Sequence, residues 1–172
     1  MKAAAGRVPV IAHVGIILTT EEVITHTNAP VIIYNIPQFT GVAFTKDNAH
    51  RLLDNPEVVG VKHTSTDLYV LERMRSAYPN KVYFNGFDEM FLSALVAGAD
   101  PAIGTTINLF ALRFTLIRDL YRKGAMAQAL VEQEKVNRGV ELLVKYGILM
   151  ESNTLARCQG SNAVLAVLPS GR

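Results

Sequence analysis

The sequence is poor in the features that mark several large classes of protein. Its single cysteine, Cys158, excludes a disulfide framework within one chain and is typical of a reducing compartment. Its 17 lysines and arginines stand against 15 acidic residues, and a net charge of +2 is too small for binding nucleic acid through bulk charge. No apolar run approaches the roughly 20 residues that span a bilayer. We therefore expect a cytoplasmic protein that binds neither membranes nor nucleic acid.

Motifs for bound metals and cofactors are lacking as well. The sequence has no phosphate-binding loop and no glycine pattern for a dinucleotide. Its four histidines, His13, His26, His50 and His63, do not have the spacing of metal ligands. We therefore expect no metal and no cofactor.

Hydrophobic residues are plentiful, at 49% of 172 residues, which excludes a disordered chain. Five short apolar runs predict strands, within residues 8–15, 30–35, 58–62, 81–85 and 101–104. Helical spacing or helix-start signals occur from 19 and over 45–54, 67–77, 88–97, 108–122 and 125–146. The core-facing stripe of the last segment is predicted to be Met126, Ala129, Leu130, Gln133, Val140, Leu143 and Val144. The runs are apolar throughout, as in strands buried on both faces of a parallel sheet. The alternation predicts an α/β fold made of βαβ units, either an open sheet, which the length favours, or part of a barrel.

Polar side chains follow three of the predicted strands. Tyr34 and Lys62 each end an apolar run, and residues 85–89 follow a third. The carboxyl ends of parallel strands face the ligand crevice in α/β folds. A strand-end lysine can simply extend its ammonium into water, and a tyrosine can be a core aromatic. A desolvated Lys62 would instead be a nucleophile, because burial lowers its pKa and raises its neutral fraction.

Two other polar segments allow both a structural and a functional interpretation. Asp88 and Glu89 are either an acidic pair at a helix N-terminus or ligand-binding residues. Residues 104–106 are either a turn with a helix cap or donors for an anion.

Four motifs together resemble one known family. They are Tyr34-Asn35-Ile36-Pro37, Gly60-Val61-Lys62-His63-Thr64-Ser65, Phe84-Asn85-Gly86-Phe87-Asp88-Glu89 and Ile103-Gly104-Thr105-Thr106. Over about residues 30–148 the chain resembles the N-acetylneuraminate lyases, the sialic acid aldolases of the dihydrodipicolinate synthase-like family. The resemblance implies a (β/α)8 TIM barrel and a class I aldolase that cleaves sialic acid to N-acetylmannosamine and pyruvate. It also implies a homo-oligomer, since the family is usually tetrameric.

The resemblance assigns roles to residues of this chain. Lys62 would form a Schiff base with the keto carbon of pyruvate, and Tyr34 would shuttle a proton to and from the sugar hydroxyl. Thr64 would lie near the reacting carbons. Four further residues would contact the polyhydroxylated tail of the substrate: Gly86, Asp88, Glu89 and Thr105.

Compared with the family, the sequence is shortened. The first two strands of the barrel and the segment of the fourth strand are missing from the pattern. We therefore expect a partial TIM barrel with about five parallel strands over residues 1–148, followed by a divergent tail over 149–172. Two alternatives to a sialic acid lyase stay open at this point. One is an inactive or impaired fragment of such an enzyme, and the other is an aldolase for another 2-keto-3-deoxy sugar acid.

Overall fold

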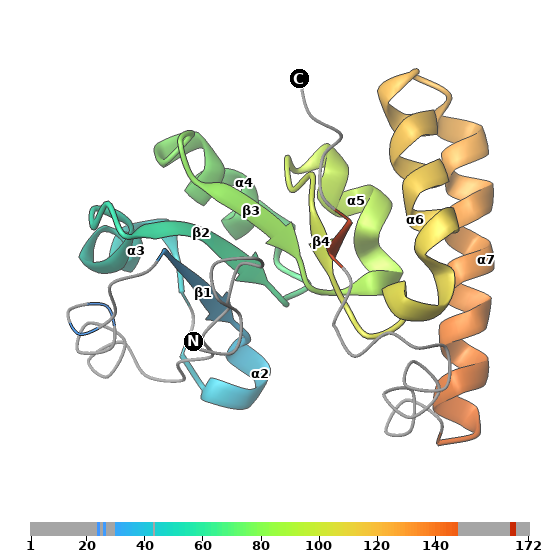
Figure 1. Cartoon of the computed structure of the whole chain (residues 1–172), viewed down its shortest axis with the longest axis horizontal. Coiled ribbons are helices and arrows are strands. Elements are labelled where there is room, and N and C mark those ends of the chain that lie inside the picture. The colour runs from blue at the N-terminus through green and yellow to red at the C-terminus, as the bar shows by residue number, and fades with distance from the viewer. Residues whose placement is uncertain (1–23, 25, 27–29, 43, 148–165, 168–172) are drawn as a thin grey trace. The chain divides into compact units, whose positions relative to one another are not determined.

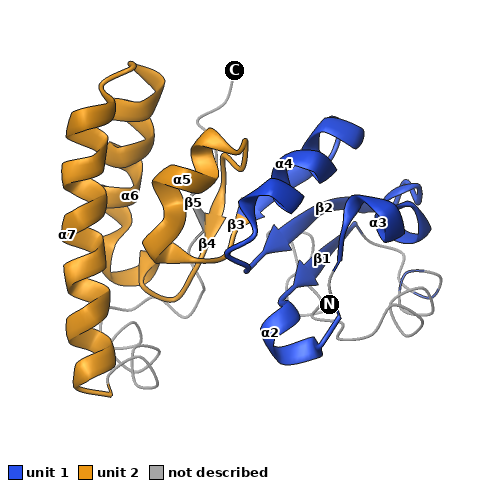
Figure 2. Ribbon diagram, turned by 180° about the vertical axis from the view of Figure 1, so that it is seen from behind, with its two compact units in different colours: residues 1–84 blue, residues 85–172 orange. Residues whose placement is uncertain are grey.

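The computed structural model describes residues 24, 26, 30–42, 44–147 and 166–167 (Figure 1). The predicted strand at 8–15, the helix start at 19 and almost all of the tail at 149–172 lie outside these residues. The chain divides into two compact units, residues 1–84 and 85–172 (Figure 2). The predicted boundary after residue 148 falls outside the described residues and stays a prediction.

The first unit alternates strands and helices. Its elements are β1 (Val31–Asn35), α2 (Pro37–Thr40), α3 (Lys46–Leu53), β2 (Val58–His63), α4 (Leu68–Ala77) and β3 (Val82–Asn85), whose last residue lies in the second unit. β1 and β2 run parallel, with Tyr34 opposite Lys62 and Asn35 opposite His63. This is the βαβ arrangement that the apolar runs predict, because strands covered by helices need no polar face.

Local signals fix where the helices of the first unit begin. The amide of Thr45 donates to the side chain of Asn48 at 2.8 Å, which starts α3. Asp67 caps α4 by accepting from the amide of Val70 at 3.0 Å. The short helix α2 was not expected, although Pro37 at its first position is a common way to begin a helix.

The second unit is mostly helical. Its elements are η1 (Asp88–Met90), α5 (Phe91–Val96), β4 (Ala102–Ile103), α6 (Ile107–Arg122), α7 (Met126–Lys145) and β5 (Ala166–Val167). Asn85 pairs with Ala102 in parallel, whereas β4 pairs with β5 in antiparallel fashion. The long helices α6 and α7 lie side by side (Figures 1 and 2) and share a core around Phe91 and Phe114, whose ring centroids are 5.2 Å apart.

Four of the five predicted strands are confirmed, and the remaining one, at residues 8–15, lies outside the described residues. The predicted apolar stripe of α7 is partly wrong, because Met126 is 42% exposed and Leu130 is 62% exposed. The predicted positions Ala129 and Gln133 are buried, and they are joined by Val136, so the buried residues are spaced by four and three. A narrow stripe of buried residues is enough to hold α7 in place, because one side of the helix packs on α6, α5 and η1. The antiparallel strand β5 was not predicted either.

Candidate active site

Tyr34 and Lys62 are brought into contact by the pairing of β1 with β2. The two residues are register partners, so their side chains lie on the same face of the parallel pair. The Lys62 Nζ atom lies 4.1 Å from the centroid of the Tyr34 ring. Both side chains are half-buried. A cation above an aromatic ring is stabilised by about 0.5–2 kcal/mol, which favours this placement of the amine.

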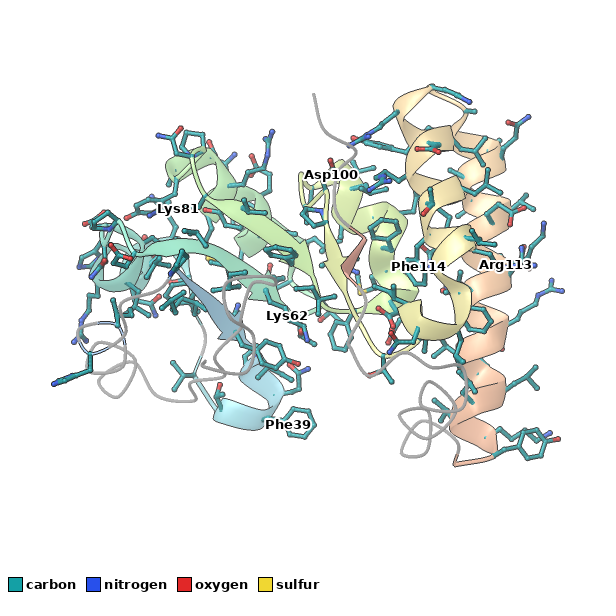
Figure 3. All side chains as sticks on the ribbon, viewed as in Figure 1. Phe39, Lys62, Lys81, Asp100, Arg113 and Phe114 are labelled. Atoms are coloured by element: carbon teal, nitrogen blue, oxygen red, sulfur yellow. The ribbon has the colours of Figure 1, made fainter. Side chains whose placement is uncertain are left out.

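A second lysine, Lys81, comes directly before β3 and has different partners from those of Lys62; Figure 3 labels both lysines. The Lys81 Nζ atom donates to the carbonyl oxygens of Asn55 and Val58, at 3.0 and 2.6 Å. These bonds tie the residue before β3 to the first residue of β2 and to the turn before it, so the Lys81 amine has a structural role. Among the described residues, no hydrogen bond or ion pair holds the amine of Lys62 in the same way. Lys62 is therefore the strand-end amine that is available for chemistry.

Thr64 lies two residues after Lys62 and is only 5% exposed. Its amide donates to the carbonyl oxygen of Asn35 at 2.8 Å, which fixes its backbone at the end of β1. Within the described part of the chain, its Oγ1 hydroxyl makes no hydrogen bond. A buried hydroxyl without a partner costs about 1–3 kcal/mol, so such a group often serves a ligand.

Two residues that were not predicted to form a pair lie directly beside Tyr34 and Lys62. Asn35 and His63 are both buried, and the Asn35 Nδ2 atom lies 2.9 Å from His63 Nδ1. The other ring nitrogen of His63, Nε2, lies 3.0 Å from the carbonyl oxygen of Asp67. Burial lowers the pKa of His63, while the hydrogen bond to the Asp67 backbone and the charge of Asp67 partly oppose that effect. The sequence signal for this pair was the adjacency of each residue to a predicted site residue.

In the second unit, the carboxylate of Asp88 is committed to the protein itself. Asp88 is buried, and its Oδ2 atom accepts from the amide and the hydroxyl of Thr106, at 2.8 and 2.5 Å. The carboxylate thereby lies at the N-terminus of α6, where the helix dipole favours a negative charge. The backbone of Gly104 passes so close to this carboxylate that a Cβ atom there would collide with it. Asp88 is therefore an acidic residue at a helix N-terminus, which is the structural one of the two interpretations given above. The helix, however, is α6 and not the helical segment that begins at Asp88.

Gln133 of α7 holds the backbone around Asp88. Its Oε1 atom accepts from the amide of Leu92 at 2.9 Å, and its Nε2 atom lies 3.2 Å from the carbonyl oxygen of Asp88. The same Nε2 atom donates to Asn137 Oδ1 at 2.8 Å. Gln133 is a polar residue within the predicted core-facing stripe of this helix, and that polarity was the sequence signal for this role.

The remaining predicted residues of the second unit lie closer to solvent. Glu89 and Thr105 are exposed, and Gly86 is half-buried. Glu89 also lines a surface groove together with residues of α7 that include Asn137, Glu141 and Lys145. Within the described ranges, no group of three or more His, Cys, Asp or Glu side chains is placed to hold a metal ion. The helices of the same part of the chain include none that is long and apolar enough to cross a membrane.

Comparisons with known proteins agree with the motifs. The model of the dihydrodipicolinate synthetase family matches residues 19–171. An N-acetylneuraminate lyase of Histophilus somni (strain 2336) is 40% identical over 143 residues, which cover 83% of this chain and 49% of the relative. One from Rhizobium meliloti (strain 1021) is 34% identical over 194 aligned residues, covering 92% of this chain and 64% of the relative. That alignment is longer than the 172 residues of this chain, so the relative carries internal segments that this chain lacks.

Solved structures give the same result for the fold. The N-acetylneuraminate lyase from Fusobacterium nucleatum complexed with pyruvate has a TM-score of 0.79 and 30% identity, covering 94% of this chain and 67% of that one. A Clostridium difficile protein in complex with mannosamine has a TM-score of 0.78 at 30% identity, with coverage of 94% and 68%. The fold is therefore α/β and corresponds to part of a TIM barrel, as the resemblance implied. The chain spans about half the length of the first curated relatives that it matches.

Proposed function

The chain belongs to the dihydrodipicolinate synthetase family, and we propose that it carries the Schiff-base centre of an aldolase that cleaves N-acetylneuraminate to N-acetylmannosamine and pyruvate. The observation that carries the proposal is the position of the Lys62 Nζ atom, 4.1 Å from the centroid of the Tyr34 ring. It supports the proposal because a nucleophilic amine and a phenol that moves protons must lie within reach of one substrate.

The proposed reaction begins with the neutral amine of Lys62, which attacks the keto carbon of the open-chain substrate. Loss of water gives a protonated imine, which accepts the electron pair of the bond between the α carbon and the hydroxyl-bearing β carbon when that bond breaks. The phenol of Tyr34 gives its proton to the departing water, and the phenolate that remains then takes the proton from the sugar hydroxyl, so that N-acetylmannosamine leaves as the aldehyde. The remaining enamine is protonated on carbon, and water then hydrolyses the imine to release pyruvate and the free amine.

Thr64 supports this assignment because its Oγ1 hydroxyl is buried without a partner among the described residues. In the proposed complex this hydroxyl would bind a polar group near the imine carbon. The contacts of Gly86, Asp88, Glu89 and Thr105 with the sugar tail stay a prediction from the resemblance. Of these four, Glu89 and Thr105 have exposed side chains that are open to a ligand.

The wider proposal is a cytoplasmic enzyme of carbohydrate metabolism that assembles as a homo-oligomer. Light scattering coupled to size-exclusion chromatography would measure the assembly directly. A monomer at every concentration would overturn this part of the proposal and leave the chemistry of Lys62 untouched.

The decisive experiment is trapping of the imine with borohydride in the presence of pyruvate, read by intact mass and peptide mapping. We expect one reduced pyruvate adduct, located on Lys62. The adduct should be lost completely in Lys62→Ala and kept in Lys46→Ala, which removes an exposed lysine at the start of α3. A folded wild-type chain without an adduct would show that this is an inactive fragment of the family.

The substrate is tested by replacing pyruvate with sugar acids in the same assay. We expect N-acetylneuraminate to leave the pyruvate adduct on Lys62 and to release N-acetylmannosamine. An adduct formed from a 2-keto-3-deoxy sugar acid but not from N-acetylneuraminate would move the chain to another aldolase branch.

A further inference from the structure

We propose that Asn35 and His63 form a positioning pair that holds Tyr34 and Lys62 in contact, an inference that rests on the proposed Schiff-base function. Neither residue needs to touch the substrate. Their effect would act through the ends of β1 and β2, which carry the two reacting side chains.

The register of the two strands places the pair beside the reacting groups. Asn35 is opposite His63, one residue after the partners Tyr34 and Lys62. Side chains alternate between the two faces of a strand, so the pair lies on the face opposite to the Lys62 amine. The hydrogen bond between Asn35 and His63 therefore holds the ends of β1 and β2 together on the opposite face, where it does not compete with the substrate for the Lys62 amine.

The hydrogen bonds of His63 identify the tautomer that the pair requires. The carbonyl oxygen of Asp67 can only accept, so the hydrogen of the neutral ring must be on Nε2. Nδ1 is then an acceptor, and the Asn35 amide donates to it across 2.9 Å. Both ring nitrogens are satisfied by this arrangement only while the imidazole is neutral.

The pair is anchored on both sides. The carbonyl that accepts from His63 belongs to Asp67, whose side chain also caps α4. The main chain of Asn35 accepts from the amide of Thr64, so the same strand end also holds the buried hydroxyl residue. Among the described residues, the charge that bears on His63 is that of Asp67, while β1 contributes the uncharged Asn35. Strand β1, strand β2 and the start of α4 are thereby linked through one imidazole.

The first test needs no substitution. In ¹⁵N NMR spectra of the wild-type chain at neutral pH, His63 should carry its hydrogen on Nε2 and have the shift of an unprotonated acceptor at Nδ1. Finding the hydrogen on Nδ1, or a ring protonated on both nitrogens, would overturn the proposed pair.

The second test removes the amide donor and leaves Tyr34 and Lys62 in place. Asn35→Ala should slow borohydride capture of pyruvate on Lys62 about fivefold, the effect of losing one buried hydrogen bond. Asn35→Asp should restore most of the rate, because its carboxylate can accept from a protonated His63. NMR of Asn35→Asp should then show hydrogens on both ring nitrogens.

Tyr83→Phe is the matched control. The Tyr83 hydroxyl is in the same unit and donates to the carbonyl oxygen of Met74 at 2.9 Å, so its loss also removes a buried hydrogen bond. We expect Tyr83→Phe to lower stability without changing the rate of capture. Equal slowing in Tyr83→Phe and Asn35→Ala would show that the effect is general destabilisation and would overturn the positioning role.

A readout that is independent of pyruvate separates this inference from the proposed function. Reductive methylation with formaldehyde measures the reactivity of the Lys62 amine relative to Lys46. We expect that ratio to change at least twofold in Asn35→Ala and to stay constant in Tyr83→Phe. If pyruvate is never captured but the ratio changes, the proposed function fails and the positioning pair stands. If pyruvate is captured equally by wild type and Asn35→Ala, the pair fails and the function stands.

Discussion

The ends of the strands in the two units use polar side chains in different ways. In the first unit, Tyr34 and Lys62 are half-buried and touch each other, while their buried neighbours Asn35 and His63 make the structural hydrogen bonds. In the second unit, the predicted site residue Asp88 makes the structural bonds itself. In this protein, a polar residue at the carboxyl end of a strand is therefore available for chemistry when a neighbouring residue makes the hydrogen bonds that stabilise the strand end.

The residue that follows Asp88, Glu89, gives a second contrast, between a buried and an exposed acidic residue within one unit. Asp88 and Glu89 are adjacent and have the same charge, yet one is buried against Thr106 and the other is exposed. A buried carboxylate that accepts charge-assisted hydrogen bonds stabilises the fold far more than an exposed one. Comparing the two acids by mutation therefore separates stability from any contact with substrate.

The largest effect is expected at Asp88. Asp88→Ala should lower the free energy of unfolding by about 3–5 kcal/mol, because the amide and hydroxyl of Thr106 would be left buried without their acceptor. Glu89→Ala should change it by no more than about 0.5 kcal/mol. Urea unfolding followed by far-UV circular dichroism measures both values. Similar losses for the two variants would contradict the division of roles between these acids.

Two buried glycines, one in each unit, allow the close packing of the two units to be compared. A Cβ atom at Gly60 would collide with the main chain of Val82 in the first unit, and one at Gly104 would collide with the Asp88 carboxylate in the second. Gly60→Ala and Gly104→Ala should each cost about 1–3 kcal/mol of stability. Gly41→Ala is the control: its Cβ has open space, and its φ of 67° leaves only the backbone penalty of roughly 1–2 kcal/mol.

A double-mutant cycle distinguishes the two collisions. The cost of Gly104→Ala should shrink in the background of Asp88→Ala, because the colliding side chain has been removed. The cost of Gly60→Ala should be the same in both backgrounds. Full additivity of Gly104→Ala with Asp88→Ala would show that the close approach in the second unit does not limit stability.

The smallest expected effect is a dependence of stability on pH through His63. Its folded pKa lies below the ordinary value of 6.5, so the fold favours the neutral ring. The stabilising contribution is complete above pH 6.5 and is lost as the pH falls toward the folded pKa, since the unfolded chain then binds the proton more readily. The loss should be about 1 kcal/mol for each pH unit between the two pKa values.

Unfolding free energies measured between neutral pH and about pH 5 test this dependence. His63→Gln removes the titrating group, so its stability should decline less on acidification than that of the wild type. His50→Gln is the matched control, because His50 is an exposed histidine of α3 in the same unit. Identical slopes for the wild type and His63→Gln would show that His63 does not contribute.

Much of the first unit could be predicted from local sequence. Residues 31–35 and 58–63 form strands because they are apolar runs bounded by turn residues, and the parallel pairing follows from the helix between them. Position at the end of such strands also gave Tyr34 and Lys62. The short helix α2 and the antiparallel pairing of Ala166–Val167 with β4 escaped prediction, because a four-residue helix and a two-residue strand have no periodicity.

The use of each polar side chain could not be predicted in the same way. Asn35 and His63 are 28 residues apart, and the amide of Leu92 and Gln133 are 41 residues apart. No local pattern links such partners, since their hydrogen bonds form only after strands and helices have packed. The same holds for Met126 and Leu130, which the helical pattern assigned to the core and which the structure leaves exposed.

The sequence by itself determined the alternation of strands and helices, the family motifs and the placement of an amine and a phenol at neighbouring strand ends. These depend on properties within a few residues, namely apolar runs, caps and the two-residue period of a strand. Tertiary structure alone decided that Asp88 serves the N-terminus of α6, that Lys81 is tied to carbonyls and that Lys62 is left with the Tyr34 ring. The physical reason is that a buried polar group must find its partner wherever packing brings one within reach.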